Sequence, residues 1–111
     1  KYALEFRNEN WFEEDVFDIL KQYNAALVYS HSREFPTDLK CTADFMYLRF
    51  HGPDKPYYSK YSQGQLAGEF EKISLFLNEC SEIYVFFNNT YNAYAIENAQ
   101  MWKDLSNNNS I

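Results

Sequence analysis

Residues 45–51 read FMYLRFH, and their alternation of apolar and polar side chains indicates how the chain folds. Successive side chains of a β-strand point to opposite faces of a sheet, so this run predicts one strand with two unlike faces. One face carries Tyr47, Arg49 and His51, and Gly52 follows as a sharp exit from the strand. The opposite face is apolar and consists of Met46, Leu48 and Phe50.

Three further β-like runs lie on either side of this strand and alternate with helical or loop segments. These runs cover residues 2–7, 26–30 and 83–88. Helical patterns cover residues 10–23, a segment that follows Ser62, and residues 91–105. Strands that alternate with helices at this spacing form parallel βαβ units with right-handed crossovers. We therefore predict an α/β fold with four parallel strands and covering helices.

Two of these helices are preceded by capping signals. Ser62 and Gln65 have the spacing of a capping box, and Asn10 and Glu13 have the spacing of its Asx variant. Each pair predicts the residue at which a helix begins.

The composition limits the classes of protein to which the chain can belong. A length of 111 residues with 46% hydrophobic content fits one domain with a real core. The formal net charge of −6 argues against extended contact with nucleic acid and leaves only a local basic patch open. No apolar run reaches the ~18 residues that a membrane span needs.

The cysteines and the first residue give two further expectations. Cys41 and Cys80 stand far apart in the sequence without CxxC or Cys/His spacing, so no redox motif or zinc site is indicated, and a reduced, cytoplasmic chain is expected. Because Lys1 stands where an initiating Met would be, we expect the chain to be a piece of a longer protein.

Charged and amide side chains gather at the predicted strand ends, where ligands bind in parallel α/β folds. Glu5 and Arg7 share one face of the first strand, as Arg49 and His51 do in the third. The second strand offers either Ser30 with Ser32, or Leu27 with Tyr29 and His31. We interpret this cluster as a site; the alternative is an ion-pair network of Glu5 with the arginines that only fills the sheet. Likewise, the loop tyrosines Tyr57, Tyr58 and Tyr61 either stack on a ligand or cover the core.

These motifs resemble a known family. EFR at residues 5–7, Trp11, TADFMYLRFHGPD at 42–54, YS at 61–62 and YVFFNN at 84–89 are similar in order and spacing to the C-terminal half of the YecE-like proteins, domain-of-unknown-function family seventy-two. Members look like TIM-type barrels of roughly twice this length, so residues 1–105 would form about half a (β/α)8 barrel and 106–111 a polar tail. The family name states that no activity is established.

The resemblance also implies functional residues. The family's characteristic strand-end positions match Glu5, Arg7, Trp11, Arg49, His51, Gly52, Tyr61, Ser62, Asn88 and Asn89. Among these we expect Glu5 and His51 to be catalytic, and Arg7, Trp11, Arg49, Tyr61, Asn88 and Asn89 to bind the ligand. The sequence departs from the family pattern at Asn8, His31 and Thr90, which weakens the implication of an intact metal site or acid/base pair.

Three functions remain open at this point. The first is binding or turnover, as by a hydrolase or lyase, of a phosphorylated or other anionic small molecule held by Arg7 and Arg49. The second is nucleic-acid binding or processing, with bases stacked on Trp11 or the loop tyrosines. The third is a non-catalytic structural or binding domain. The sequence does not identify a cofactor, and a metal-dependent variant of the first function would need His31, His51 and Glu5 together.

Four βα units alone leave two open sheet edges. We therefore expect the chain to be completed by the missing N-terminal half of a barrel, to pair with a second copy as a homodimer, or to close into a flavodoxin-like layered arrangement.

Overall fold

The computed structural model describes residues 1–34 and 36–108. Its strands and helices alternate largely as the sequence predicts. In chain order they are β1 (Tyr2–Leu4), the 3-10 helix η1 (Glu9–Trp11), α1 (Glu14–Gln22), β2 (Ala25–His31), β3 (Phe45–Phe50), α2 (Gln63–Ser74), β4 (Glu82–Phe87), the 3-10 helix η2 (Tyr91–Ala93) and α3 (Tyr94–Asn108).

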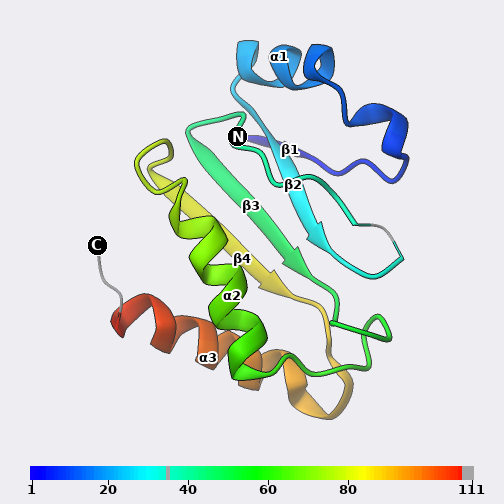
Figure 1. The fold of residues 1–111 in the computed structure, drawn as a ribbon, viewed down its shortest axis with the longest axis vertical. Coiled ribbons are helices and arrows are strands. Elements are labelled where there is room, and N and C mark those ends of the chain that lie inside the picture. The colour runs from blue at the N-terminus through cyan, green and yellow to red at the C-terminus, as the bar shows by residue number, and fades with distance from the viewer. Residues whose placement is uncertain (35, 109–111) are drawn as a thin grey trace.

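The four strands form one parallel sheet in the order β1-β2-β3-β4 (Figure 1). This confirms the predicted α/β fold. In the described part of the chain all three α-helices pack on the same face of the sheet, α1 through Phe17 and Leu20 and α2 and α3 through Leu66 and Trp102. The flavodoxin-like arrangement, which needs helices on both faces, is therefore wrong, because consecutive strand order with one covered face is the arrangement of a barrel segment.

The predicted alternation at residues 45–51 is confirmed by burial. Leu48 and Phe50 are fully buried beneath the helices, and Tyr47 and Arg49 lie on the opposite, open face. Phe50 is surrounded by rings, including those of Tyr29 and Trp102, so much of the aromatic content serves core packing.

The two capping predictions have different outcomes. At Ser62 the box forms in full: the Gln65 backbone N–H donates to Ser62 Oγ at 3.1 Å, and the Ser62 N–H donates to Gln65 Oε1 at 2.8 Å. The Asn10–Glu13 box is wrong. Asn8 caps instead, by accepting from the Asn10 N–H at 2.9 Å, and this starts the short η1 turn before α1.

Two predicted boundaries also change. β1 ends at Leu4, so Glu5 and Arg7 lie just beyond the strand rather than in it. The last helix begins at Tyr94 and continues through Asn108, so residues 106–108 of the predicted tail are helical. Residues 109–111 lie outside the described residues.

The open face of the sheet is concave. Lys1 Nζ and Glu82 Oε1 are 2.9 Å apart, although two strands separate β1 from β4 in the sheet. Neighbouring strands lie about 4.8 Å apart, so this contact is made most easily when the sheet curves toward its open face. This curvature and the strand order are consistent with about half of a barrel.

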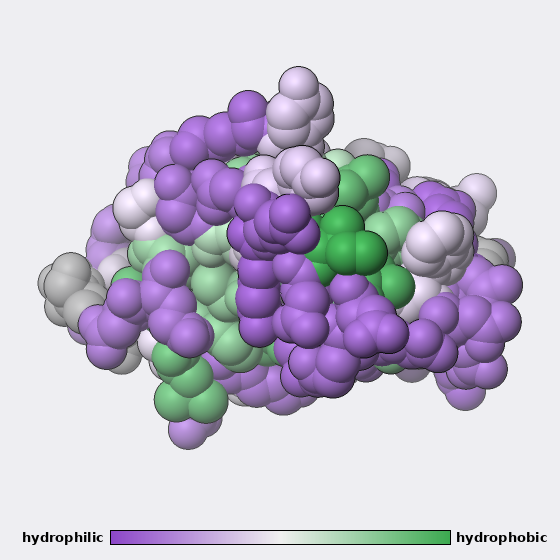
Figure 2. All heavy atoms as spheres, turned by 90° about the horizontal axis from the view of Figure 1, so that it is seen from above, coloured by the Kyte–Doolittle hydropathy of each residue, from purple (hydrophilic) through white to green (hydrophobic). Residues whose placement is uncertain are grey.

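Hydrophilic residues dominate the surface seen from above in Figure 2, with hydrophobic ones visible between them. Within the described residues, none of the helices combines the length and apolarity that crossing a membrane requires.

Candidate functional site

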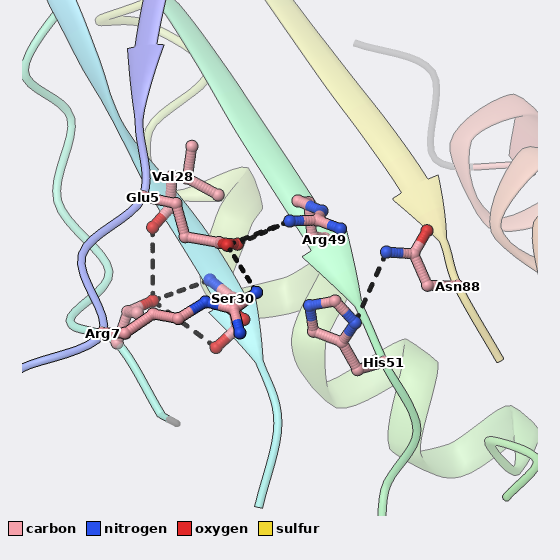
Figure 3. A network of polar contacts seen from close by, with 8 residues as sticks. Glu5, Arg7, Val28, Ser30, Arg49, His51 and Asn88 are labelled. Atoms are coloured by element: carbon pink, nitrogen blue, oxygen red, sulfur yellow. Dashed lines mark hydrogen bonds and ion pairs between the residues drawn. The ribbon is translucent and has the colours of Figure 1, made fainter. Parts of the chain in front are cut away.

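The carboxyl ends of β1, β3 and β4 bring polar side chains together on the open face of the sheet (Figure 3). Glu5 and Arg7 follow β1, Arg49 lies near the end of β3, and His51 follows it directly. Asn88 follows β4, where its backbone N–H donates to the Phe50 carbonyl at 2.8 Å. Parallel pairing therefore places side chains from three strands at one edge of the sheet.

Glu5 is the centre of this cluster. Both of its carboxylate oxygens accept from Arg49 Nη1 at 3.0 Å, and Oε2 also accepts from Arg7 Nη2 at 3.2 Å. The three bonded side chains carry two positive charges and one negative charge. The pairing orients the two guanidinium groups at the strand ends.

His51 is buried, with 4% of its surface exposed. The Asn88 amide Nδ2 lies 3.4 Å from His51 Nδ1. Burial lowers the pKa of His51 below its usual range, and Arg49 lowers it further while Glu5 opposes the shift. His51 is therefore neutral around pH 7, where an imidazole can exchange a proton with a ligand.

In the loop after β3, Tyr57 has a strained backbone conformation and its ring packs against His51. The Tyr57 ring lies 5.6 Å from the His51 ring, edge to face, and Tyr57 has a φ of 71°, which is costly for an aromatic side chain. Its N–H donates to the His51 carbonyl at 2.6 Å, and its carbonyl accepts from the Tyr91 N–H at 3.2 Å. Such strain persists only where surrounding contacts hold it, and it is common at functional sites.

Gly52 makes the exit from β3 possible, as the sequence predicts. Its φ is 128°, and a Cβ atom there would lie 2.6 Å from Ser59 Oγ and 3.0 Å from the Lys55 carbonyl oxygen. Only glycine fits this conformation and this space without strain.

Two hollows meet at Glu5. The larger, of about 400 Å³, lies over the open face and is lined by Ala3, Glu5, Val28, Tyr47, Arg49, Phe86 and Asn88. A smaller hollow of about 40 Å³ lies at the strand ends and includes Arg7, Ser30, Ser32, His51 and Tyr57. Ser30 of β2 and Ser32, just after the strand, are thus the serines that line this hollow, which settles the alternative that the sequence left open.

Several predicted site residues lie elsewhere. Tyr61 is fully buried, and its hydroxyl accepts from the Gly52 N–H at 2.9 Å. Asn89 is also fully buried and donates to Asn98 Oδ1 at 2.8 Å and to the Ser59 carbonyl at 3.0 Å. Trp11 stacks on Phe6 with ring centroids 4.9 Å apart and lines neither hollow. In this structure these residues position the loops and η1 rather than face the cluster.

His31 points to the helix-covered face, away from Glu5. Its Nε2 lies 2.9 Å from Glu69 Oε1, and its Nδ1 lies 2.8 Å from the Tyr61 hydroxyl oxygen. The predicted metal-dependent variant needs His31 beside Glu5 and His51, and this geometry contradicts it. The sequence analysis missed Glu69, although its place on the apolar stripe between Leu66 and Ile73 indicates a buried carboxylate in need of a partner.

These features define a class of protein. Its members consist of parallel βα units, with helices covering one face of the sheet and a polar cluster on the opposite face at the carboxyl ends of the strands. The chain belongs to the family described as "Protein of unknown function DUF72", whose model matches residues 1–110. This confirms the family that the sequence motifs resemble.

Relatives and solved structures agree with this assignment. The UPF0759 protein YunF of Bacillus subtilis (strain 168) is 26% identical, and the match covers 93% of this chain and 45% of the relative. A DUF72 family protein of Thermotoga maritima is similar in structure with a TM-score of 0.80 and 28% identity, covering 95% of this chain and 45% of that one. A DUF72 family protein of Enterococcus faecalis shares the fold with a TM-score of 0.82 at 23% identity, covering 95% and 46%. The chain therefore spans about half the length of these proteins.

Proposed function

We propose that this chain supplies half of a barrel-type site that binds a small anionic, phosphorylated ligand at the carboxyl ends of the strands. Arg49 and Arg7 bind the anion, Asn88 orients the ligand, and His51 exchanges a proton with it. Glu5 holds the arginines in place. A hydrolase or lyase reaction would use the same groups.

The observation that carries this proposal is the position of Arg49. Only its Nη1 is engaged by Glu5, and the Arg49 side chain keeps 29% of its surface exposed in the 400 Å³ hollow. A guanidinium presents several donors in a planar fork, which suits phosphate or carboxylate oxygens. The neutral His51 nearby adds a group for proton transfer without adding a second fixed charge.

Thermal shift and calorimetric titration with inorganic phosphate and a panel of sugar phosphates test the proposal. We expect wild type to be stabilised and Arg49→Gln to lose most of the response. Arg49→Lys keeps the charge but not the fork, so it should retain only part. Lys103→Gln is the matched control because it removes the same charge from the exposed surface of α3.

Two results would contradict the anion site. One is equal stabilisation of wild type and Arg49→Gln by every anion. The other is no response in wild type together with a large loss of stability in Arg49→Gln, which would make the Glu5–Arg49 pair structural only.

The completion of the barrel is part of the same proposal. The concave, uncovered face and the two open edges support a second set of βα units, from the longer chain or from a second copy. Light scattering distinguishes these sources: a stable dimer supports the second copy, and a monomer at high concentration supports the longer chain.

A second candidate function rests on a different surface at the same end of the sheet. Lys55 Nζ lies 4.6 Å from the centroid of the Tyr58 ring, and the Tyr58 and Tyr91 centroids are 5.4 Å apart. Tyr91 in turn contacts Tyr94, over which Lys60 lies at 5.9 Å. Exposed rings interleaved with lysines suit the stacking of single-stranded nucleic acid, despite the net charge of −6.

Binding of a short single-stranded oligonucleotide, measured by fluorescence anisotropy at several salt concentrations, tests this second candidate. Loss of binding in Tyr58→Ala and Lys55→Gln, but not in Arg49→Gln, supports the tyrosine surface. No binding at low salt rejects it, since electrostatic attraction to phosphate is strongest there.

A further inference from the structure

The larger hollow on the open face has an aromatic wall beside Arg49. Tyr47 of β3 and Phe86 of β4 both line this hollow, and their rings stack with centroids 4.9 Å apart and planes 27° apart. Phe86 keeps 44% of its surface exposed, although it belongs to a strand of the sheet. The polar cluster therefore shares its hollow with an exposed aromatic surface, which we call the Tyr47–Phe86 pair.

The strand register places this pair at the level of the guanidinium group. Arg49 and Phe86 are partners across β3 and β4, so their side chains leave the same face of the sheet at the same level. Asn88 follows Phe86 by two residues and lines the same hollow. A ligand that contacts Arg49 from within this hollow consequently lies next to the Phe86 ring.

The hollow is larger than a phosphate group requires. Its volume of about 400 Å³ falls within the range of roughly 300–1,000 Å³ that is usual for small-molecule sites. The lining side chains of β1 and β2, Ala3 and Val28, are small and apolar. The space that a phosphate at Arg49 leaves unfilled is thus bordered by aromatic and aliphatic groups, which suits a planar, apolar part of a ligand.

We propose that the anionic ligand carries an aromatic or heteroaromatic ring, which stacks on the Tyr47–Phe86 pair while Arg49 binds its phosphate. This inference rests on the proposed function, because the anion at Arg49 brings the ring to the pair. It narrows the ligand class to aryl phosphates and similar ring-bearing phosphates. A sugar would instead place hydroxyl groups against Phe86, Ala3 and Val28, whose side chains offer no hydrogen-bond partner.

The place of the ring has one competing occupant. The second set of βα units that would complete the barrel faces the same hollow, and an apolar side chain from it would also pack on Phe86. Such a side chain would exclude the ring of a ligand. The two occupants therefore predict opposite effects of a ring on the affinity of a phosphate ligand.

The test compares methyl, cyclohexyl and phenyl phosphate, which carry the same charged group on different substituents. Calorimetric titration measures their affinities for the protein in the assembly state that light scattering identifies. We expect phenyl phosphate to bind roughly tenfold more tightly than methyl phosphate, because its ring stacks on the pair. Cyclohexyl phosphate should lie between them, because it buries apolar surface without a planar face.

Variants of Phe86 separate the ring contact from the anion contact. Phe86→Ala should lose most of the preference for phenyl over methyl phosphate and keep the affinity for methyl phosphate within about twofold, since Arg49 is intact. Phe86→Tyr keeps an aromatic ring and should retain the preference. Tyr23→Ala is the matched control, because it removes an exposed ring at the end of α1 that does not line the hollow.

The outcomes distinguish this inference from the function on which it rests. Equal affinities of wild type for methyl and phenyl phosphate, or a phenyl preference that survives in Phe86→Ala, would overturn the ring contact. Methyl phosphate binding that Arg49→Gln removes would leave the anion site standing in either case. If none of the three phosphates binds wild type, the anion site and the ring contact both fail.

Discussion

The two faces of the sheet carry polar clusters near the same strand ends, but the clusters differ in how completely they are enclosed. On the covered face, α2 lies over Tyr29, His31 and Tyr61, and Glu69 of α2 joins them. On the open face, Glu5, Arg49 and His51 border a hollow that no described helix covers.

The covered cluster uses its hydrogen-bonding groups internally. The Tyr29 hydroxyl donates to Glu69 at 3.1 Å, and His31 links Glu69 to Tyr61. Burial alone would raise the pKa of Glu69, but His31, Lys72 and Tyr29 outweigh it and hold that pKa below its usual range. This network stabilises the fold, whereas the open cluster keeps an accessible guanidinium. A polar cluster at a strand end indicates binding only when its donors still reach a hollow.

Removal of the Glu69 carboxylate should have the largest effect on stability. Glu69→Ala leaves the Tyr29 hydroxyl and His31 without their shared partner in a buried setting, which should cost about 3 kcal/mol of unfolding free energy. Urea denaturation measures this loss. Glu71→Ala, at an exposed position of the same helix, should change the free energy by less than about 0.5 kcal/mol. If the two substitutions lowered the unfolding free energy equally, the proposal that the covered network stabilises the fold would be contradicted.

The open cluster should respond differently to loss of its carboxylate. Glu5→Gln removes the negative charge that Arg49 and Arg7 share, and this partly exposed pair should cost only about 1 kcal/mol of stability. Phosphate should bind Glu5→Gln more tightly, by roughly threefold to tenfold, because the competing carboxylate charge is gone. Calorimetric titration measures the affinity. A stability loss as large as that of Glu69→Ala, with no change in binding, would make both clusters structural.

The sequence predicts the open cluster because polar and apolar side chains alternate clearly in residues 45–51. Leu48 is buried beneath the helices, so the adjacent Arg49 must lie on the opposite face of the sheet. The run at residues 26–30 is apolar on both faces, so its sequence does not show which face of the sheet each side chain occupies. Only the structure shows that the His31 side chain lies on the helix-covered face.

Contacts between distant segments were harder to predict. Tyr61 and Asn89 follow the polar motifs in the sequence, but the fold turns both inward, where the Gly52 N–H and Asn98 become their partners. Sequence patterns indicate which face a residue takes within a strand more reliably than which distant residue it meets.

The smallest expected effect is the contribution of His51 to the pH dependence of the unfolding free energy. The pKa of His51 is lowered in the folded chain, so the unfolded chain binds a proton more readily as the pH falls below about 6.5. The stability that neutral His51 contributes is fully present above that pH and is lost as the pH falls toward the folded pKa. His51→Gln should therefore lose less stability than wild type between pH 7.5 and 5.5, by no more than the ~1.4 kcal/mol per pH unit that one proton allows. Urea denaturation across this range measures the difference in slope. Parallel curves would mean that Arg49 and burial do not hold His51 neutral, and the proton-transfer role proposed for it would then lose its support.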